Sequence, residues 1–379
     1  MKTGIITFHF VHNQGAVLQC YALQTALKKL GHDASVIDYR PRYHAARYAA
    51  RKNPFALASN NWKKNCDQTV LHKAYHAARG FARGIISCIK APDQLREENF
   101  DRFVSKHLIQ TECFSSLARL RKAAPKMDAY ISGSDQLWNP DLLDGSMDPA
   151  YFLDFGGDEV KRITYAVSLK QGYNDQEKIA IKKMCERIDF LSTREHSETL
   201  DEVLDRSYHV CVDPTLLLDQ EDYRPLESEN SEKEPYIFVY GFETSDGICE
   251  AVKLISEELG LRVINGSPDK IKLGAGITTA ENYAPDQFLS YIKNAEFVVT
   301  NSFHGTAFSI IYGKQFVTVP HSTRGKRMIE LLHKLGLSGR LWGEESFSWK
   351  TPVDHDTARE NMAQLRAESL DYLKGSLKQ

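Results

Sequence analysis

The first forty residues combine two apolar runs with one helical pattern. Residues 4–10 and 34–39 are apolar, with β-branched and aromatic side chains, and each run predicts a buried strand. Residues 16–30 repeat apolar side chains on one helical face, and Gly31 is a natural helix stop. A strand, a helix and a strand at this spacing predict a parallel β-α-β unit.

The same alternation resumes at residue 128, and an acidic, proline-containing stretch at 219–235 divides it. We interpret this stretch as a linker. Strands are predicted at 128–132, 162–168, 190–193, 208–212, 236–240, 262–265, 297–301 and 316–319, and helices at 175–187, 197–205, 248–259, 286–294, 305–312 and 327–335. The pattern predicts an α/β fold in which two Rossmann-like domains, 1–218 and 219–354, face one another across a cleft, followed by a helix at 355–379.

Residues 42–126 interrupt the first series and are mostly helical in character. From Arg40 to Lys126 the chain has 18 Lys/Arg and 6 Asp/Glu, a local net charge of +12, although the whole chain carries −2. We expect a basic helical insertion in the N-terminal domain. Such a block indicates an anionic partner, namely a membrane surface, a phosphorylated lipid or a nucleic acid; the alternative is a solvated helical surface.

Composition excludes several classes of protein. With 379 residues, 42% hydrophobic and 26% charged, the chain has the composition of a soluble globular protein. No apolar run approaches the roughly 20 residues of a membrane-spanning helix, and the first ten residues lack the features of a secretion signal. Seven scattered cysteines without a CxxC pair indicate reduced thiols. We therefore expect a cytoplasmic protein.

The segment 297–312, FVVTNSFHGTAFSIIY, carries the strongest candidate chemistry. A buried strand leads into a polar turn and a short apolar helix, whose first N–H groups suit an anion. Gly305 allows close approach of a ligand, and Ser302 and Thr306 add hydroxyls. His304 adds an imidazole that can bind an anion or transfer a proton. The alternative is a capped turn with a structural histidine.

A second basic loop, HSTRGKR at 321–327, follows the next predicted strand. Arg324, Lys326 and Arg327 then lie at the same sheet edge as His304, where guanidinium groups suit carboxylate or phosphate. Arg327 begins an apolar-faced helix and is therefore the best fixed of the three. The alternative is an exposed basic turn.

Two further segments end predicted strands of the first series. Arg194, in the STRE segment, is expected to point toward the cleft. The segment ISGSDQLWNP at 131–140 offers carboxylate, amide and aromatic groups that suit a sugar: Asp135, Gln136, Trp138 and Asn139. The alternative for the latter is a turn with a core tryptophan. The DPT sequence at 213–215 is interpreted as a structural junction.

Several familiar motifs are missing from the sequence. A GxGxxG segment does not follow the first strand, which argues against a dinucleotide. The sequence also lacks a GxxxxGK[ST] loop, an HExxH motif and a Cys/His cluster. We therefore expect neither a metal nor another cofactor.

Taken together, these motifs resemble the polysaccharide pyruvyltransferase family. The segments NQGAVLQCYALQ, GSDQLWNP, STRE, VDPTLLL and TNSFHGTAFSIIYGKQF occur in the family's order over about residues 1–335. The resemblance implies a GT-B-like pair of domains. It also implies transfer of a pyruvyl group from phosphoenolpyruvate to two sugar hydroxyls, which forms a cyclic ketal. Such acceptors belong to a bacterial capsule, exopolysaccharide or cell-wall glycan and are often lipid-linked at the cytoplasmic face.

The resemblance also implies roles for individual residues. His304 matches the family's SFHGT histidine at the phosphoenolpyruvate site, and we hypothesise that it transfers a proton. Arg194 matches an arginine that holds the donor, and Arg324, Lys326 or Arg327 matches a further donor-binding cation. The acceptor side is expected to include Asn13, Gln19, Asp135, Gln136, Trp138 and Asn139.

At one place the chain departs from the family pattern. Some members carry an acidic GNxGDE-like turn where this chain has NQGA at 13–16, so a carboxylate base at that turn is missing here. Asp135 is a hypothetical substitute.

Two other functions remain open at this stage. One is a glycosyltransferase of the same architecture that uses a nucleotide-sugar donor, and the other is a non-catalytic glycan- or lipid-binding protein. On the pyruvyltransferase interpretation, the basic segment 42–126 would contact an anionic membrane or a lipid-linked acceptor at the inner membrane face, and no nucleic acid is expected.

Overall fold

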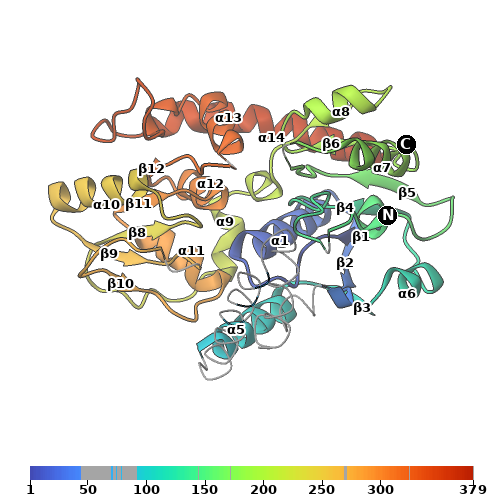
Figure 1. Cartoon of the computed structure of the whole chain (residues 1–379), viewed down its shortest axis with the longest axis horizontal. Helices are drawn as coiled ribbons and strands as arrows, with labels where there is room; N and C mark the ends of the chain where they lie inside the picture. The colour runs from blue at the N-terminus through green and yellow to red at the C-terminus, as the bar shows by residue number, and fades with distance from the viewer. Residues whose placement is uncertain are drawn as a thin grey trace.

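The computed structural model describes residues 1–43, 70, 74, 78, 92–143, 145–170, 172–268, 271–323 and 325–378. These residues form two five-stranded parallel sheets with helices between and around them (Figure 1). The α/β fold with two Rossmann-like sheets is therefore confirmed. We call residues 1–218, which build the first sheet, the N-terminal half, and residues 219–354, which build the second, the C-terminal half.

The first sheet has the strand order β3-β2-β1-β4-β5. Its strands are β1 (Lys2–Ile6), β2 (Asp33–Tyr39), β3 (Gln110–Phe114), β4 (Ala129–Ser132) and β5 (Lys161–Thr164). A small sheet of β6 (Ser192–Thr193) and β7 (His209–Val210) extends it through a bridge from Val167 to Thr193. The helices among the described residues of this half are α1 (Gln14–Lys29), α5 (Pro92–His107), α6 (Leu117–Lys122), α7 (Asp175–Cys185) and α8 (Glu198–Val203).

The second sheet repeats the plan with the order β10-β9-β8-β11-β12. Its strands are β8 (Tyr236–Tyr240), β9 (Arg262–Asn265), β10 (Thr278–Thr279), β11 (Phe297–Thr300) and β12 (Gln315–Thr318). The described helices of this half are α9 (Gln220–Tyr223), α10 (Asp246–Leu259), α11 (Pro285–Asn294), α12 (Phe303–Ile311) and α13 (Lys326–Lys334), and α14 (His355–Lys378) follows them. Short 3₁₀ turns occupy Pro149–Phe152 and Pro214–Leu217 in the N-terminal half and Arg224–Leu226 and Ser338–Arg340 in the C-terminal half.

Helix α14 returns from the C-terminal half to the N-terminal half (Figure 1). The hydroxyl of Tyr372 donates to the carbonyl of Thr164 at 2.8 Å, and Ser369 accepts the backbone N–H of Val212 at 3.0 Å. Leu373 is wholly buried in a core cluster that contains residues of both sheets. The helix therefore ties the two halves together.

One expectation about the predicted insertion is wrong, and the expectation of a linker at 219–235 is incomplete. Residues 110–114 lie inside the predicted helical insertion but form β3, an edge strand whose middle residues are exposed and polar, so a strand pattern was not visible. The predicted linker contains α9, and Tyr223 in it is wholly buried with its ring 5.0 Å from that of Phe308. Its first part is therefore packed between the halves.

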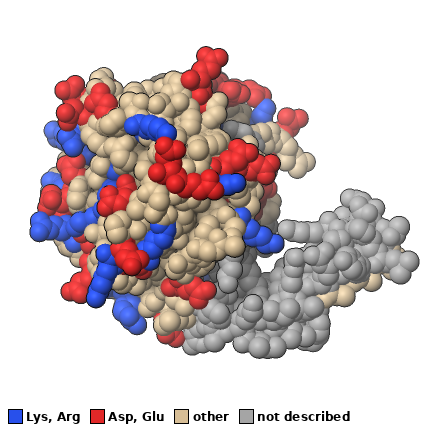
Figure 2. All heavy atoms as spheres, turned by 90° about the vertical axis from the view of Figure 1, so that its left-hand side faces the viewer, with Lys and Arg blue, Asp and Glu red and all other residues tan. Residues whose placement is uncertain are grey.

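Much of the basic segment 42–126 lies outside the described residues, and the membrane contact predicted for it therefore stays a prediction. On the face shown in Figure 2, Lys and Arg side chains of the described residues lie among Asp and Glu side chains. None of the helices in the described part of the chain is both long enough and apolar enough to cross a membrane.

Candidate active site

The carboxyl ends of the two sheets meet where the N-termini of α1 and α12 approach one another. Helix α1 follows β1, the middle strand of the first sheet, and α12 follows β11, which lies next to the middle strand of the second. Ligands of open parallel sheets bind beyond the carboxyl ends of such strands. The hydroxyl of Tyr240 donates to Gln14 at 3.0 Å across this junction. A Cβ atom on Gly15 would overlap the imidazole of His304, so only glycine permits this approach. The junction therefore places His304 between the halves.

His304 lies in the first turn of α12, whose N-cap is Ser302. Its Nε2 atom is 3.7 Å from a carboxylate oxygen of Asp213, and its side chain is 13% exposed. Nε2 is buried and has no hydrogen-bond partner among the described residues. Burial lowers the pKa of His304 below its ordinary value, and this outweighs the opposing effect of Asp213. The imidazole therefore presents a nitrogen that a ligand could engage.

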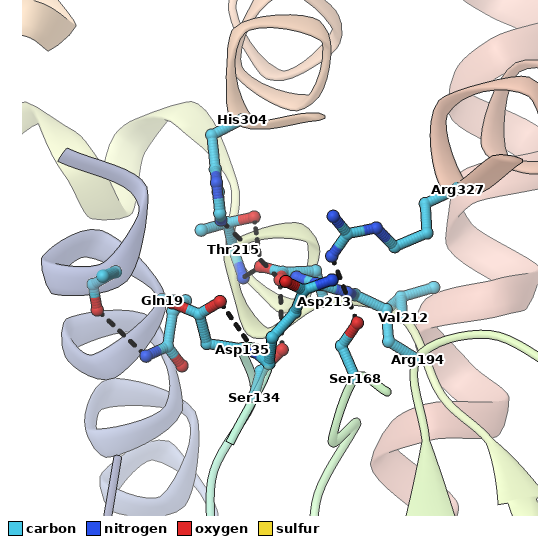
Figure 3. Close-up of polar contacts among 12 residues, drawn as sticks. Gln19, Ser134, Asp135, Ser168, Arg194, Val212, Asp213, Thr215, His304 and Arg327 are labelled. Atoms are coloured by element: carbon cyan, nitrogen blue, oxygen red, sulfur yellow. Dashed lines mark hydrogen bonds and ion pairs between the residues drawn. The ribbon is translucent and has the colours of Figure 1, made fainter. Parts of the chain in front are cut away.

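Asp213 is the centre of the polar cluster in Figure 3. Its carboxylate accepts hydrogen bonds from Arg194 Nη1 at 2.6 Å, Ser134 Oγ at 3.2 Å and Thr215 Oγ1 at 2.7 Å. Burial alone would raise the pKa of Asp213, but His304, Arg194 and Thr215 lower it below its ordinary value. A structural junction was the only role that the sequence predicted for 213–215. A charged residue directly after an apolar strand was the available signal, because a buried charge requires partners.

Arg194 and Glu195 extend the cluster. The Arg194 side chain is 3% exposed, and its guanidinium lies 4.9 Å from the centre of the Phe303 ring. Its charge is paired with Asp213, so the role of Arg194 in holding the donor stays a prediction. Glu195 accepts hydrogen bonds from Ser168 Oγ at 2.6 Å and from the Leu169 N–H at 3.1 Å.

Arg327 approaches the cluster from α13. Figure 3 shows Arg327 and His304 directed toward the same region from different helices. Arg327 Nη1 donates to Ser168 Oγ at 3.1 Å, a contact between the two halves. Lys326 instead lies 3.9 Å from Glu330 and is 45% exposed, and Arg324 lies outside the described residues. Of the two cations in the described part of this loop, Arg327 is therefore the one that contacts the cluster, and which of the three cations binds the donor stays a prediction.

A cavity of about 350 Å³ opens beside Arg327. It has acidic, basic and hydroxyl groups on its walls, which suits a polar ligand more than an apolar one. The lining residues are Gln136, Leu169, Lys170, Gly172, Glu195, His196, Ser197, Glu198, Thr199, Thr323, Lys326 and Arg327.

Other residues predicted on the donor side serve the helix itself. Thr306 is wholly buried, and its hydroxyl donates to the carbonyl of Ser302 at 3.1 Å and pairs with Thr318. A Cβ on Gly305 would overlap Thr300, so this glycine permits strand–helix packing. Ser302 accepts the N–H of Gly305 at 3.4 Å as the N-cap. The expectation that the Thr306 hydroxyl faces a ligand is therefore wrong, because the side chain points into the core.

The predicted sugar platform is also wrong. Trp138 is wholly buried and stacks on Phe152 at a ring distance of 4.3 Å, so its face is covered by the core. Asn139 is buried and donates to Gln136 at 3.3 Å. Gln136 lines the cavity, and its acceptor-binding role stays a prediction. The segment thus brings one of these three side chains to open space.

The remaining acceptor-side residues lie near the junction. Asn13 caps α1 by accepting the Ala16 N–H at 3.1 Å, and Gln19 is buried and donates to Thr7 Oγ1 at 2.9 Å. Asp135 has a positive φ of 92° and accepts the N–H of Gln136 at 2.7 Å. In Figure 3 it lies beside Ser134 in the cluster. The acceptor-binding roles of Asn13, Gln19 and Asp135 stay predictions.

The contact between Gly15 and His304 yields a first test. Gly15→Ala is expected to displace the imidazole and lower activity at least tenfold, because a misplaced catalytic group loses much of its rate. Gly375→Ala in α14 is a matched control, since its added methyl group meets nothing within 4 Å. Turnover and thermal unfolding are measured for both variants. Equal activity of the two would contradict the proposed approach of α1 to His304.

Comparison with known proteins was made on both sequence and fold. A sequence model described as polysaccharide pyruvyl transferase matches residues 13–323. A search of curated proteins gave no match. A putative UDP-N-acetylglucosamine 2-epimerase from Listeria monocytogenes has 11% identity and a TM-score of 0.49, covering 98% of this chain and 90% of that chain.

Two further solved structures show similar coverage. UDP-GlcNAc 2-epimerase from Neisseria meningitidis bound to UDP-GlcNAc has 12% identity and a TM-score of 0.46, covering 99% of this chain and 94% of that chain. The E. coli heptosyltransferase WaaC with ADP has 12% identity and a TM-score of 0.37, covering 96% and 100%. The family match covers most of the sequence and includes His304, Asp213 and Arg194. The chain therefore belongs to the polysaccharide pyruvyl transferase family.

Proposed function

We propose that the protein transfers a pyruvyl group from phosphoenolpyruvate to two hydroxyls of a sugar in a bacterial surface polysaccharide or its lipid-linked precursor. The observation that carries this proposal is the convergence of His304 and Arg327 on one buried polar cluster. Membership of the family supports the same reaction class. The two residues supply an acid–base group and a fixed cation, which are the groups that an anionic donor needs.

The donor carries a carboxylate and a phosphate, and both require positive partners. The guanidinium of Arg327 suits either group, because its planar fork matches two oxygens at once. The first turn of α12 adds backbone N–H groups and the positive end of a helix dipole beside His304. We therefore place the donor between His304 and Arg327.

The proposed reaction balances without a further reactant. His304 gives a proton to the methylene carbon of phosphoenolpyruvate, and the adjacent carbon becomes an oxocarbenium-like centre. One sugar hydroxyl adds to that carbon, the carbon–oxygen bond to phosphate breaks, and the second hydroxyl closes the ketal. Of the two hydroxyl protons, one replaces the proton that His304 gave to the new methyl group, and the other leaves with inorganic phosphate.

The acceptor sugar is placed in the 350 Å³ cavity beside Arg327. Gln136 can exchange hydrogen bonds with sugar hydroxyls there, and the carboxylate of Glu195 can accept one. The Oε2 atom of Glu195 is buried and has no hydrogen-bond partner among the described residues, although it lies 3.6 Å from Arg194 Nε. Asp135 as the acceptor-side base stays a proposal.

Thermal unfolding with phosphoenolpyruvate, compared with a panel of nucleotide sugars, tests the donor. A ligand at about 100 times its Kd stabilises the folded state by roughly 2.7 kcal/mol. We expect phosphoenolpyruvate to raise Tm for the wild type and not for His304→Ala. A rise with a nucleotide sugar alone would replace the proposal by glycosyl transfer, and the absence of any donor effect would favour a glycan- or lipid-binding protein.

A further inference from the structure

We propose that Ser168 is a positioning residue that orients the guanidinium of Arg327 for the anionic donor. The inference rests on the proposed function, because it concerns the cation assigned to phosphoenolpyruvate. None of the sequence motifs pointed to Ser168. It follows β5 in the N-terminal half, whereas Arg327 belongs to the C-terminal half.

The hydrogen bonds around Ser168 have only one consistent direction. A serine hydroxyl carries one proton, and a carboxylate can only accept, so Ser168 donates to Glu195 Oε1 at 2.6 Å. Its oxygen must then accept from Arg327 Nη1 at 3.1 Å. Glu195 is itself held by the Leu169 N–H at 3.1 Å. The serine oxygen therefore faces Arg327 with a negative charge directly behind it.

Burial makes this arrangement rigid. Ser168 is wholly buried and Glu195 is 9% exposed, so the surrounding protein restricts the rotamers of both side chains. Arg327 is a long side chain with many rotamers, and ordering it on ligand binding costs conformational entropy. Holding one Nη atom fixes the plane of the whole guanidinium and with it the direction of the remaining N–H groups. Ser168 thus lowers the entropic cost of donor binding.

The test is a double-mutant cycle on phosphoenolpyruvate affinity, measured by titration calorimetry on the full chain. Ser168→Ala is expected to weaken binding about tenfold, within the range of coupling between hydrogen-bonded residues. In the Arg327→Ala background, Ser168→Ala is expected to have no further effect, because its action passes through the guanidinium. Ser376→Ala is the control, a buried serine of α14 that donates to the carbonyl of Leu373 and should leave affinity unchanged.

The outcomes separate this inference from the proposed function. If the wild type does not bind phosphoenolpyruvate, the proposed function fails first. If the wild type binds and Ser168→Ala binds equally well, or if its effect persists undiminished in the Arg327→Ala background, the positioning role is overturned. Should Ser168→Ala fail to fold, Ser168→Cys replaces it, since a thiol of similar size is a weak acceptor and must weaken binding only while Arg327 is present.

Discussion

Replacing His304 by glutamine is expected to lower kcat/KM for pyruvyl transfer by about 10²- to 10⁴-fold, the usual contribution of a general acid. Glutamine keeps an N–H group that can donate a hydrogen bond, but its amide does not act as an acid near neutral pH. The Nε2 atom of His304 has no hydrogen-bond partner among the described residues and the side chain is 13% exposed, so the substitution removes chemistry more than packing. Phosphate release that depends on the acceptor glycan measures the effect, with thermal unfolding as the control for folding.

The pH profile of the same variant supplies an independent check. Because burial lowers the pKa of His304 below its ordinary value, the protonated fraction of the free enzyme falls as the pH rises through that lowered pKa. The acid must be protonated to act, so kcat/KM should fall over the same range. This limb should be missing from the residual activity of His304→Gln. Normal turnover in the variant would rule out proton transfer by His304.

Replacing Asp213 by alanine is expected to destabilise the fold by about 3–5 kcal/mol, because the buried guanidinium of Arg194 would lose its hydrogen-bonded carboxylate and keep only Glu195, 3.6 Å from its Nε atom. Urea unfolding measures the loss. Asp356→Ala is the matched control, since that carboxylate is 89% exposed in its pair with Arg359 and should contribute at most about 1 kcal/mol. A loss no greater than the control's would contradict a structural role for the buried pair.

Two further observations should accompany that loss of stability. The double variant Asp213→Leu/Arg194→Met is expected to recover part of it, because neither member of the hydrogen-bonded pair is then left buried without the other. The pKa of Asp213 is lowered by the fold, so its contribution to stability is present above its ordinary pKa and is lost as the pH falls through the lowered one. The acid dependence of unfolding should therefore be weaker in Asp213→Ala than in the wild type.

Sequence patterns predicted most strands of the two parallel sheets and placed His304 and Arg327 at the same sheet edge. Both residues follow buried strands of one sheet, and the carboxyl ends of parallel strands share an edge. Strand β3 was missed because an exposed edge strand such as QTECF has no continuous apolar run. A run of apolar residues marks a strand only when most of its side chains are buried, and in β3 only Phe114 is buried.

The direction in which a side chain points was the part that patterns did not reveal. Thr306 and Trp138 are residue types suited to ligands, yet the packing of α12 against β12 and of Trp138 against Phe152 turns both inward. Asp213 and Ser168 gain their importance from partners that are distant in sequence. Only the packed structure shows which polar groups share one network.

The return of α14 to the N-terminal half also affects how the protein is made. The first sheet leaves the ribosome first, but Tyr372 and Leu373, which cover part of it, are synthesised after both sheets. Until then the N-terminal half exposes apolar surface, the condition in which partly made chains aggregate. The N-terminal half therefore completes its packing only after α14 has been synthesised, and we expect both halves to reach their final packing after that point.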